Sequence, residues 1–156
     1  MKLHNIQILI LRLAIAGLFL YEGIGKINDG WHGSPAPLME DLTSFQKKAT
    51  GLQLAYLDQV AIPYAGIWSR LITLGETATG ISMLLGLFVR LSSVTAILMV
   101  LNLHAANGTL FSVRAFGSPW AGLILCSLLI LFLARAGRWF GIDEMLAKTN
   151  PRGVFW

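Results

Sequence analysis

Charged side chains are scarce in this chain of 156 residues, since Asp, Glu, Lys and Arg together make up only 13% of it. Soluble globular domains carry about a quarter. The formal net charge is +4, but no run of Lys and Arg forms the basic stripe that tracks a phosphate backbone. The composition therefore argues against a soluble domain and against a nucleic-acid partner.

Cysteine is almost absent. The one cysteine, Cys126, excludes an intrachain disulfide and a Cys-x-x-Cys redox cycle within this chain. Quinone reduction by paired thiols is thereby excluded as well. We expect Cys126 to be a small buried hydrophobe, as free cysteines usually are.

Histidine is also rare, and its placement argues against a bound metal or haem. A transmembrane haem needs two facing histidines at similar depth, whereas His4, His32 and His104 fall at different levels of the predicted protein. No histidine stands in a metal-ligand cluster with cysteines or carboxylates. The sequence predicts neither haem nor metal.

Long apolar runs dominate what is present, namely Ile6–Ile24, Ala65–Val89, Leu91–Ala106 and Pro119–Ala134. A hydrocarbon core of about 30 Å needs roughly 20 such residues of helix. We therefore predict an all-α integral membrane protein, a four-transmembrane-helix bundle forming a single membrane domain over 1–156. The predicted helices are about 5–26, 64–89, 91–107 and 119–138.

Polar segments connect and follow the apolar runs. An outer loop over 28–62 carries Leu38, Leu42 and Phe45 at helical spacing, which predicts a short amphipathic helix on the membrane surface, ending near Gly51. Arg90 marks a very tight connection that makes its two helices antiparallel neighbours. A cytoplasmic tail over 139–156 contains a short helical stretch.

Lys and Arg at the ends of the apolar runs predict orientation. One side collects Lys2, Arg90, Arg135, Arg138, Lys148 and Arg152, and the other collects Lys26, Lys47, Lys48 and Arg114. The bias predicts a multi-pass protein of the inner (cytoplasmic) membrane with both termini in the cytoplasm.

Charges inside the apolar runs are the candidate functional residues, because an unpaired charge at that depth costs several kcal/mol. At a rise of about 1.5 Å per residue, Arg12 and Glu76 fall at a similar level on neighbouring helices. We predict that these two side chains pair. Glu76 then serves either a pocket or proton relay, or an ion pair that fixes helix register.

A second group of polar residues maps to the outer half of the membrane by the same counting. These residues are Glu22, Lys26, Arg70, Asn102, His104 and Asn107. We predict that they line a pocket beneath the outer loop. The alternative is that each caps, snorkels or bonds a neighbouring helix, which suits Lys26 at a helix end. For His104, a hydrogen-bonding role facing the pocket fits better than a ligand role.

These residues carry a family resemblance. The run Leu11-Arg12-Leu13-Ala14, then Gly23-Ile24-Gly25-Lys26, resembles the opening of DoxX/DoxD-type membrane proteins. Gly75-Glu76, Gly80 and Leu84-Leu85-Gly86-Leu87-Phe88-Val89-Arg90-Leu91 resemble the second helix of that family and its tight turn. Arg12, Lys26, Glu76 and Arg90 are the positions that match the pattern.

The resemblance implies a four-helix membrane protein of respiratory quinone chemistry, similar to the DoxD-type subunit of thiosulfate:quinone oxidoreductase. A quinone would enter from the lipid bilayer as a diffusible co-substrate. Glu76 or His104 would be catalytic and move protons, while Arg70 and Lys26 would attract an anionic sulfur substrate. Arg12, Glu22, Asn102 and Asn107 complete the predicted substrate-binding set.

A second hypothesis is a non-catalytic membrane module that binds a partner, aids assembly or carries a small molecule. The chain offers no obvious flavin or iron ligands, so a second redox subunit is an expected partner of the first hypothesis. The sequence leaves open whether the chain forms a homo-oligomer.

Overall fold

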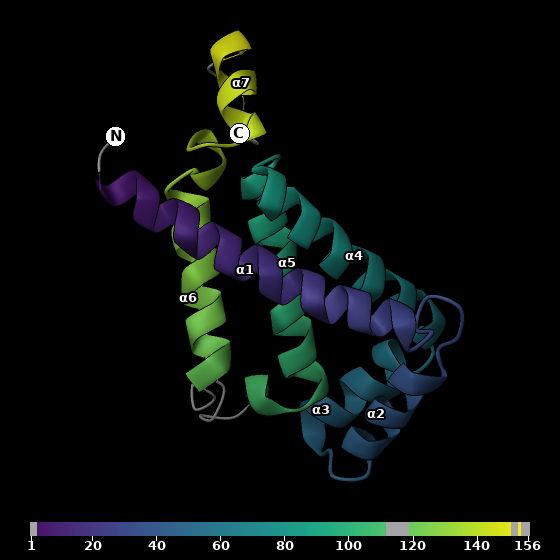
Figure 1. The fold of residues 1–156 in the computed structure, drawn as a ribbon. Helices are drawn as coiled ribbons and strands as arrows, with labels where there is room; N and C mark the ends of the chain where they lie inside the picture. Colours follow the sequence, from purple (N-terminus) through teal and green to yellow (C-terminus); the bar gives the residue numbers. More distant parts are fainter. Residues whose placement is uncertain (1–2, 112–118, 151–152, 154–156) are drawn as a thin grey trace.

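The computed structural model is all-helical over the residues that it describes, which are 3–111, 119–150 and 153 (Figure 1). Lys2, Arg114 and Arg152, on which the predicted orientation partly depends, lie outside these residues. The elements are α1 (Leu3–Asn28), α2 (Ala36–Gln46), α3 (Gly51–Tyr56), η1 (Leu57–Ala61), α4 (Ala65–Leu85), α5 (Val89–Ala106), η2 (Thr109–Phe111), α6 (Pro119–Leu133), η4 (Ala136–Arg138) and α7 (Ile142–Thr149).

Two of the described helices, α1 and α5, are long and apolar enough to cross a membrane. A shorter apolar helix occupies Trp120–Leu133 within α6. Helix α4 has 21 residues, but Arg70, Glu76 and several hydroxyl side chains interrupt its apolar sequence.

The four long helices pack around one apolar core. Helix α1 lies against α4 and α6, and α5 lies against the same two helices (Figure 1). Core side chains come from every one of them, including Phe19, Met83, Ala96 and Leu128. The apolar periodicity of each run thus gives a shared buried face, while many leucines on the outward faces remain exposed.

The turn between α4 and α5 differs from the predicted one. The helix ends at Leu85, and residues 86–88 make the turn, so Arg90 lies inside α5 and not in the connection. Gly86 adopts a left-handed conformation, φ 66°, which a residue without Cβ takes readily. Helices α4 and α5 are antiparallel neighbours, as predicted. The residue that makes the turn is Gly86, however, and not Arg90.

The outer loop folds into a cap made of α2, α3 and η1. The predicted amphipathic helix is confirmed as α2, although it ends at Gln46 and not near Gly51. Its apolar face does not lie bare on a surface, because Leu38 and Leu42 pack with Leu57, Ala61 and Ala106 in a second apolar core. Gln53 Nε2 also donates a hydrogen bond of 3.0 Å to the carbonyl oxygen of Ala106. The cap is thereby fixed to the helices beneath it.

Candidate functional site

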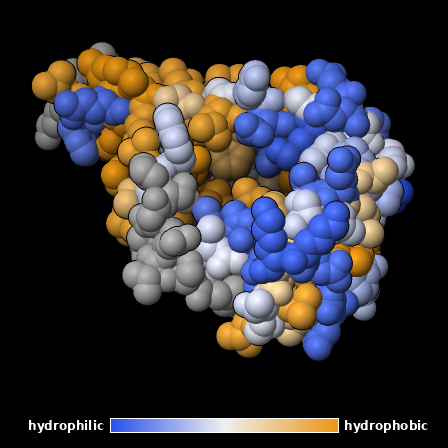
Figure 2. All heavy atoms as spheres, turned by 90° about the horizontal axis from the view of Figure 1, so that it is seen from below, coloured by the Kyte–Doolittle hydropathy of each residue, from blue (hydrophilic) through white to orange (hydrophobic). Residues whose placement is uncertain are grey.

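A cavity of about 1380 Å³ lies between the cap and helices α1, α4 and α5. Figure 2 shows a hollow with a hydrophobic floor, bordered by hydrophilic residues. The lining is mainly apolar and includes six aromatic side chains, Phe19, Tyr21, Trp31, Phe45, Tyr56 and Trp68. Binding sites for small organic molecules typically have this form, an apolar wall with a few placed polar groups.

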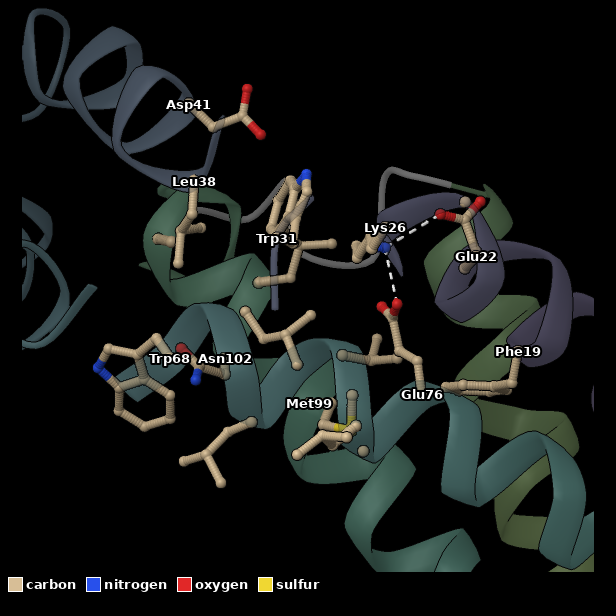
Figure 3. A pocket seen from close by; sticks show the side chains of 18 of the residues that line it. Phe19, Glu22, Lys26, Trp31, Leu38, Asp41, Trp68, Glu76, Met99 and Asn102 are labelled. Atoms are coloured by element: carbon tan, nitrogen blue, oxygen red, sulfur yellow. Dashed lines mark hydrogen bonds and ion pairs between the residues drawn. The ribbon is translucent and has the colours of Figure 1, made fainter. Parts of the chain in front are cut away.

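One polar cluster in this wall centres on Lys26, in the last turn of α1. Its Nζ lies 2.7 Å from Glu76 Oε2 on α4 and 3.2 Å from Glu22 Oε2, one turn earlier on α1 (Figure 3). The ammonium also lies 5.6 Å from the ring centroid of Trp31, a cation–π distance. Helical spacing places Glu22 and Lys26 on one face, and the packing of α1 on α4 brings Glu76 to them.

Burial differs across this cluster. The side chains of Lys26 and Glu76 are 18% and 15% exposed, whereas that of Glu22 is 53% exposed. The three groups therefore form a short chain of charges from solvent into the cavity. Such a chain can pass a proton or hold a polar headgroup.

A second polar pair lines the cavity away from Lys26. The hydroxyl of Tyr56, in the cap, donates a hydrogen bond to Asn102 Oδ1 on α5. Burial raises the pKa of Tyr56 above its usual value, so the phenol keeps its proton and remains a donor at neutral pH.

The charge of the lining is acidic. Glu22, Asp29, Asp41 and Glu76 face the cavity with Lys26 as the one cation among its described lining residues. Like charges repel across the short distances of a site of this kind. The lining therefore favours a neutral or cationic ligand over a free anion.

An apolar wall connects the cavity with the outside of the helices. Leu71 and Leu74 on α4, and Leu98 and Leu103 on α5, all line the cavity, and each is more than half exposed. The exposed apolar surface of α4 and α5 thus continues into the cavity. A ligand with an apolar tail can therefore enter the cavity across this surface of α4 and α5.

The structure brings together four of the predicted site residues, three from the predicted pocket group and Glu76, which was predicted to lie with Arg12. Glu22, Lys26, Glu76 and Asn102 all line the cavity. The sequence analysis missed the aromatic side chains, and Trp31 and Trp68 in particular. Their spacing from the ends of the apolar runs is typical of interfacial tryptophans, so nothing in the sequence separates the two roles.

The other predicted residues lie elsewhere, which corrects the predicted lining. Arg70 is exposed on α4 and does not line the cavity. His104 Nδ1 lies 2.6 Å from the hydroxyl of Thr109, and Asn107 Oδ1 accepts bonds from the Thr109 hydroxyl and N–H. His104 and Asn107 thus close the end of α5 at η2, the local bonding that the alternative interpretation expected.

The predicted pair of Arg12 with Glu76 is wrong. Arg12 is 1% exposed, and its guanidinium donates to the carbonyl oxygens of Ala136 at 2.8 Å, Trp139 at 2.9 Å and Phe140 at 3.0 Å. The depth estimate compared levels along two helices and took no account of the segment that follows α6. That segment, η4 and the start of the tail, folds back and supplies carbonyl oxygens to Arg12, which does not line the cavity.

Asp143 completes this junction between tail and helices. Its carboxylate accepts the backbone N–H groups of Phe88 at 2.7 Å and Val89 at 3.0 Å, at the start of α5. Burial raises the pKa of Asp143, while these N–H groups, Arg12 and Arg138 oppose the rise. The sequence gives no signal for a cap from a residue so far along the chain.

Two further sequence predictions concern Cys126 and a metal site. Cys126 is exposed on α6, so the prediction that it is buried is wrong. Among the residues that the structure describes, no three His, Cys, Asp or Glu side chains gather as a metal site.

Comparison with known proteins gives one match. Searches of curated proteins and of solved structures found no similar protein. The family model DoxX matches residues 7–106, a range that runs through α1, the cap, α4 and α5 and includes every residue of the cavity wall. The chain therefore belongs to the DoxX family, a membrane family often linked to quinone-related oxidoreductase functions.

Proposed function

We propose that the chain is the quinone-binding subunit of an oxidoreductase of the inner membrane, crossing it with α1, α4, α5 and α6 and keeping both termini in the cytoplasm. One observation carries the proposal: a half-buried Lys26–Glu76 pair, 2.7 Å apart, lies in the wall of an apolar cavity with aromatic side chains. A quinone needs an apolar space for ring and tail, and polar donors for its carbonyl oxygens. The exposed leucines of α4 and α5 supply the entrance from lipid.

Lys26 is the natural donor to the headgroup. Its ammonium carries three N–H groups, of which Glu76 and Glu22 engage two at most, so one can turn to a quinone carbonyl. Trp31, beside the same ammonium, offers a face for the ring.

Reduction of the quinone takes up two electrons and two protons, and each carbonyl oxygen becomes a hydroxyl. Lys26 gives one proton to the nearer oxygen as the electrons arrive, and is reprotonated through Glu22, whose side chain reaches solvent. The second proton reaches the other oxygen from solvent, through the open mouth of the cavity (Figure 2). Glu76 stabilises the ammonium before transfer and accepts a returning proton when a quinol is oxidised. The path of the first proton is thus the chain of charges described above.

The electrons come, in this proposal, from a partner redox subunit. Thiosulfate, the donor suggested by the resemblance to DoxD, is an anion, and the cavity offers it one cation against four carboxylates. Arg70, the second predicted anion-binding residue, does not line the cavity. We therefore place any sulfur substrate on the partner and not in this cavity.

Equilibrium binding of menadione to the detergent-purified chain tests the proposal. Lys26→Met removes the donor and keeps the length of the side chain, and should weaken binding about tenfold or more, as expected for a hydrogen bond to a charged donor. Lys47→Met, which changes an exposed lysine outside the cavity, should bind like the wild type.

Equal binding by both variants, or no binding by the wild type, would contradict the proposal. Absence of binding would favour the non-catalytic membrane module, in which the Lys26–Glu76 pair joins α1 to α4.

A further inference from the structure

The cavity holds a second polar station that the proposed proton chemistry does not use. Asn102 Oδ1 is occupied by the Tyr56 hydroxyl, which fixes the orientation of the amide. Asn102 Nδ2 has no hydrogen-bond acceptor among the described residues. It is also not one of the polar atoms in that part of the chain that are closed off from solvent without a partner. Asn102 lines the apolar cavity (Figure 3), so its amide N–H is an oriented donor without an acceptor in the cavity wall.

Measured along the helix axes, the Asn102 amide lies about one turn from Glu76. An added Cβ at Gly75 would stand 3.0 Å from Met99 Sδ, so Gly75 and Met99 share a level of the antiparallel helices α4 and α5. Glu76 and Asn102 lie on opposite sides of that level, separated by four residues of rise, about 6 Å. The two stations therefore lie at different levels of the cavity, and a ligand that bonds both must carry acceptors at opposite ends of its ring.

We propose that Tyr56 and Asn102 form a second headgroup anchor, so that the cavity selects rings with two opposed carbonyl oxygens. Lys26 binds one oxygen and the Asn102 amide binds the other, while Tyr56 acts as a positioning residue that holds the amide. The inference rests on the proposed function and adds the substrate class, para-quinones. A ring with one carbonyl, or with two adjacent ones, reaches a single station.

The preference between two ligands tests the anchor. Menadione has two opposed carbonyls, and a methyl tetralone keeps the fused rings with one. The wild type should bind menadione about threefold to tenfold more tightly than the tetralone, the effect of one neutral hydrogen bond. Asn102→Leu should remove this preference and leave tetralone affinity unchanged, which also shows that the cavity is intact.

Two further variants complete the test. Tyr56→Phe should reduce the preference, because the amide is no longer held. Thr95→Val should keep it, since Thr95 lines the cavity but its hydroxyl bonds the Leu91 carbonyl oxygen.

An unchanged preference in Asn102→Leu would overturn the second anchor while leaving quinone binding through Lys26 intact. A wild type that binds neither ligand would overturn the proposed function itself. The two failures are therefore distinct.

Discussion

Arg12 and Lys26 are both cations of α1, yet their surroundings give them different roles. Arg12 is sealed among backbone carbonyl oxygens, which are fixed acceptors that stay in place. Lys26 bonds two flexible carboxylates and keeps part of its surface open to the cavity. A sealed cation with backbone partners stabilises the fold, whereas one with mobile partners at a cavity wall is able to meet a ligand.

Arg12→Met should destabilise the protein strongly. It removes three charge-assisted hydrogen bonds and one of the two cations that act on the buried Asp143 carboxylate, a loss of roughly 3–5 kcal/mol in the free energy of unfolding. Thermal unfolding in detergent and limited proteolysis should show a lower midpoint and faster cleavage within η4 and α7. Arg70→Met, at an exposed site, is the matched control and should change little. Cleavage of the tail at the wild-type rate would contradict the role assigned to Arg12.

At the scale of elements, the α4–α5 turn is where three segments meet. Gly86 lies against the Arg12 guanidinium and against Gly141, just before α7. Its carbonyl oxygen accepts the N–H of Asp143 at 2.9 Å. The turn needs a residue that allows both a left-handed backbone and this close approach.

Gly86→Ala should therefore be destabilising. The new Cβ would stand 2.5 Å from Gly141 Cα and 2.7 Å from Arg12 Nη1, at φ 66°. Strain and displacement together should lower the free energy of unfolding by roughly 1–3 kcal/mol. Gly17→Ala is the control, because its Cβ would meet nothing within 4 Å in α1; it should raise stability by up to about 1 kcal/mol. Equal melting temperatures for the two variants would argue against the turn as described.

At the scale of the whole molecule, the sequence predicted what depends on local pattern. The apolar runs predicted the long helices, and the spacing of Leu38 and Leu42 predicted α2. Helical depth placed Glu22, Lys26 and Asn102 in one half of the membrane, but it wrongly placed Glu76 with Arg12. The prediction failed for contacts between distant segments. The tail that binds Arg12 carries no periodicity that points to α1, and Asp143 reads as an ordinary first-turn acid of a short helix.

The proposed topology places the cap and the tail on opposite sides of the membrane. In a Cys126→Ser background, Glu40→Cys on α2 and Lys148→Cys on α7 introduce single exposed thiols. A membrane-impermeant maleimide added to intact cells should label the α2 position, and should label the α7 position only after the membrane is opened. Labelling of both positions from one side would contradict four crossings.

Photolabelling with an azidoquinone, followed by mapping of the modified peptides, tests the central claim most directly. The account predicts labels on peptides of α1, α4 and α5 that contain Lys26, Glu76 and Met99, all of which line the cavity, and loss of these labels with excess menadione. Labels confined to the exposed face of α6 around Cys126, unaffected by menadione, would contradict it.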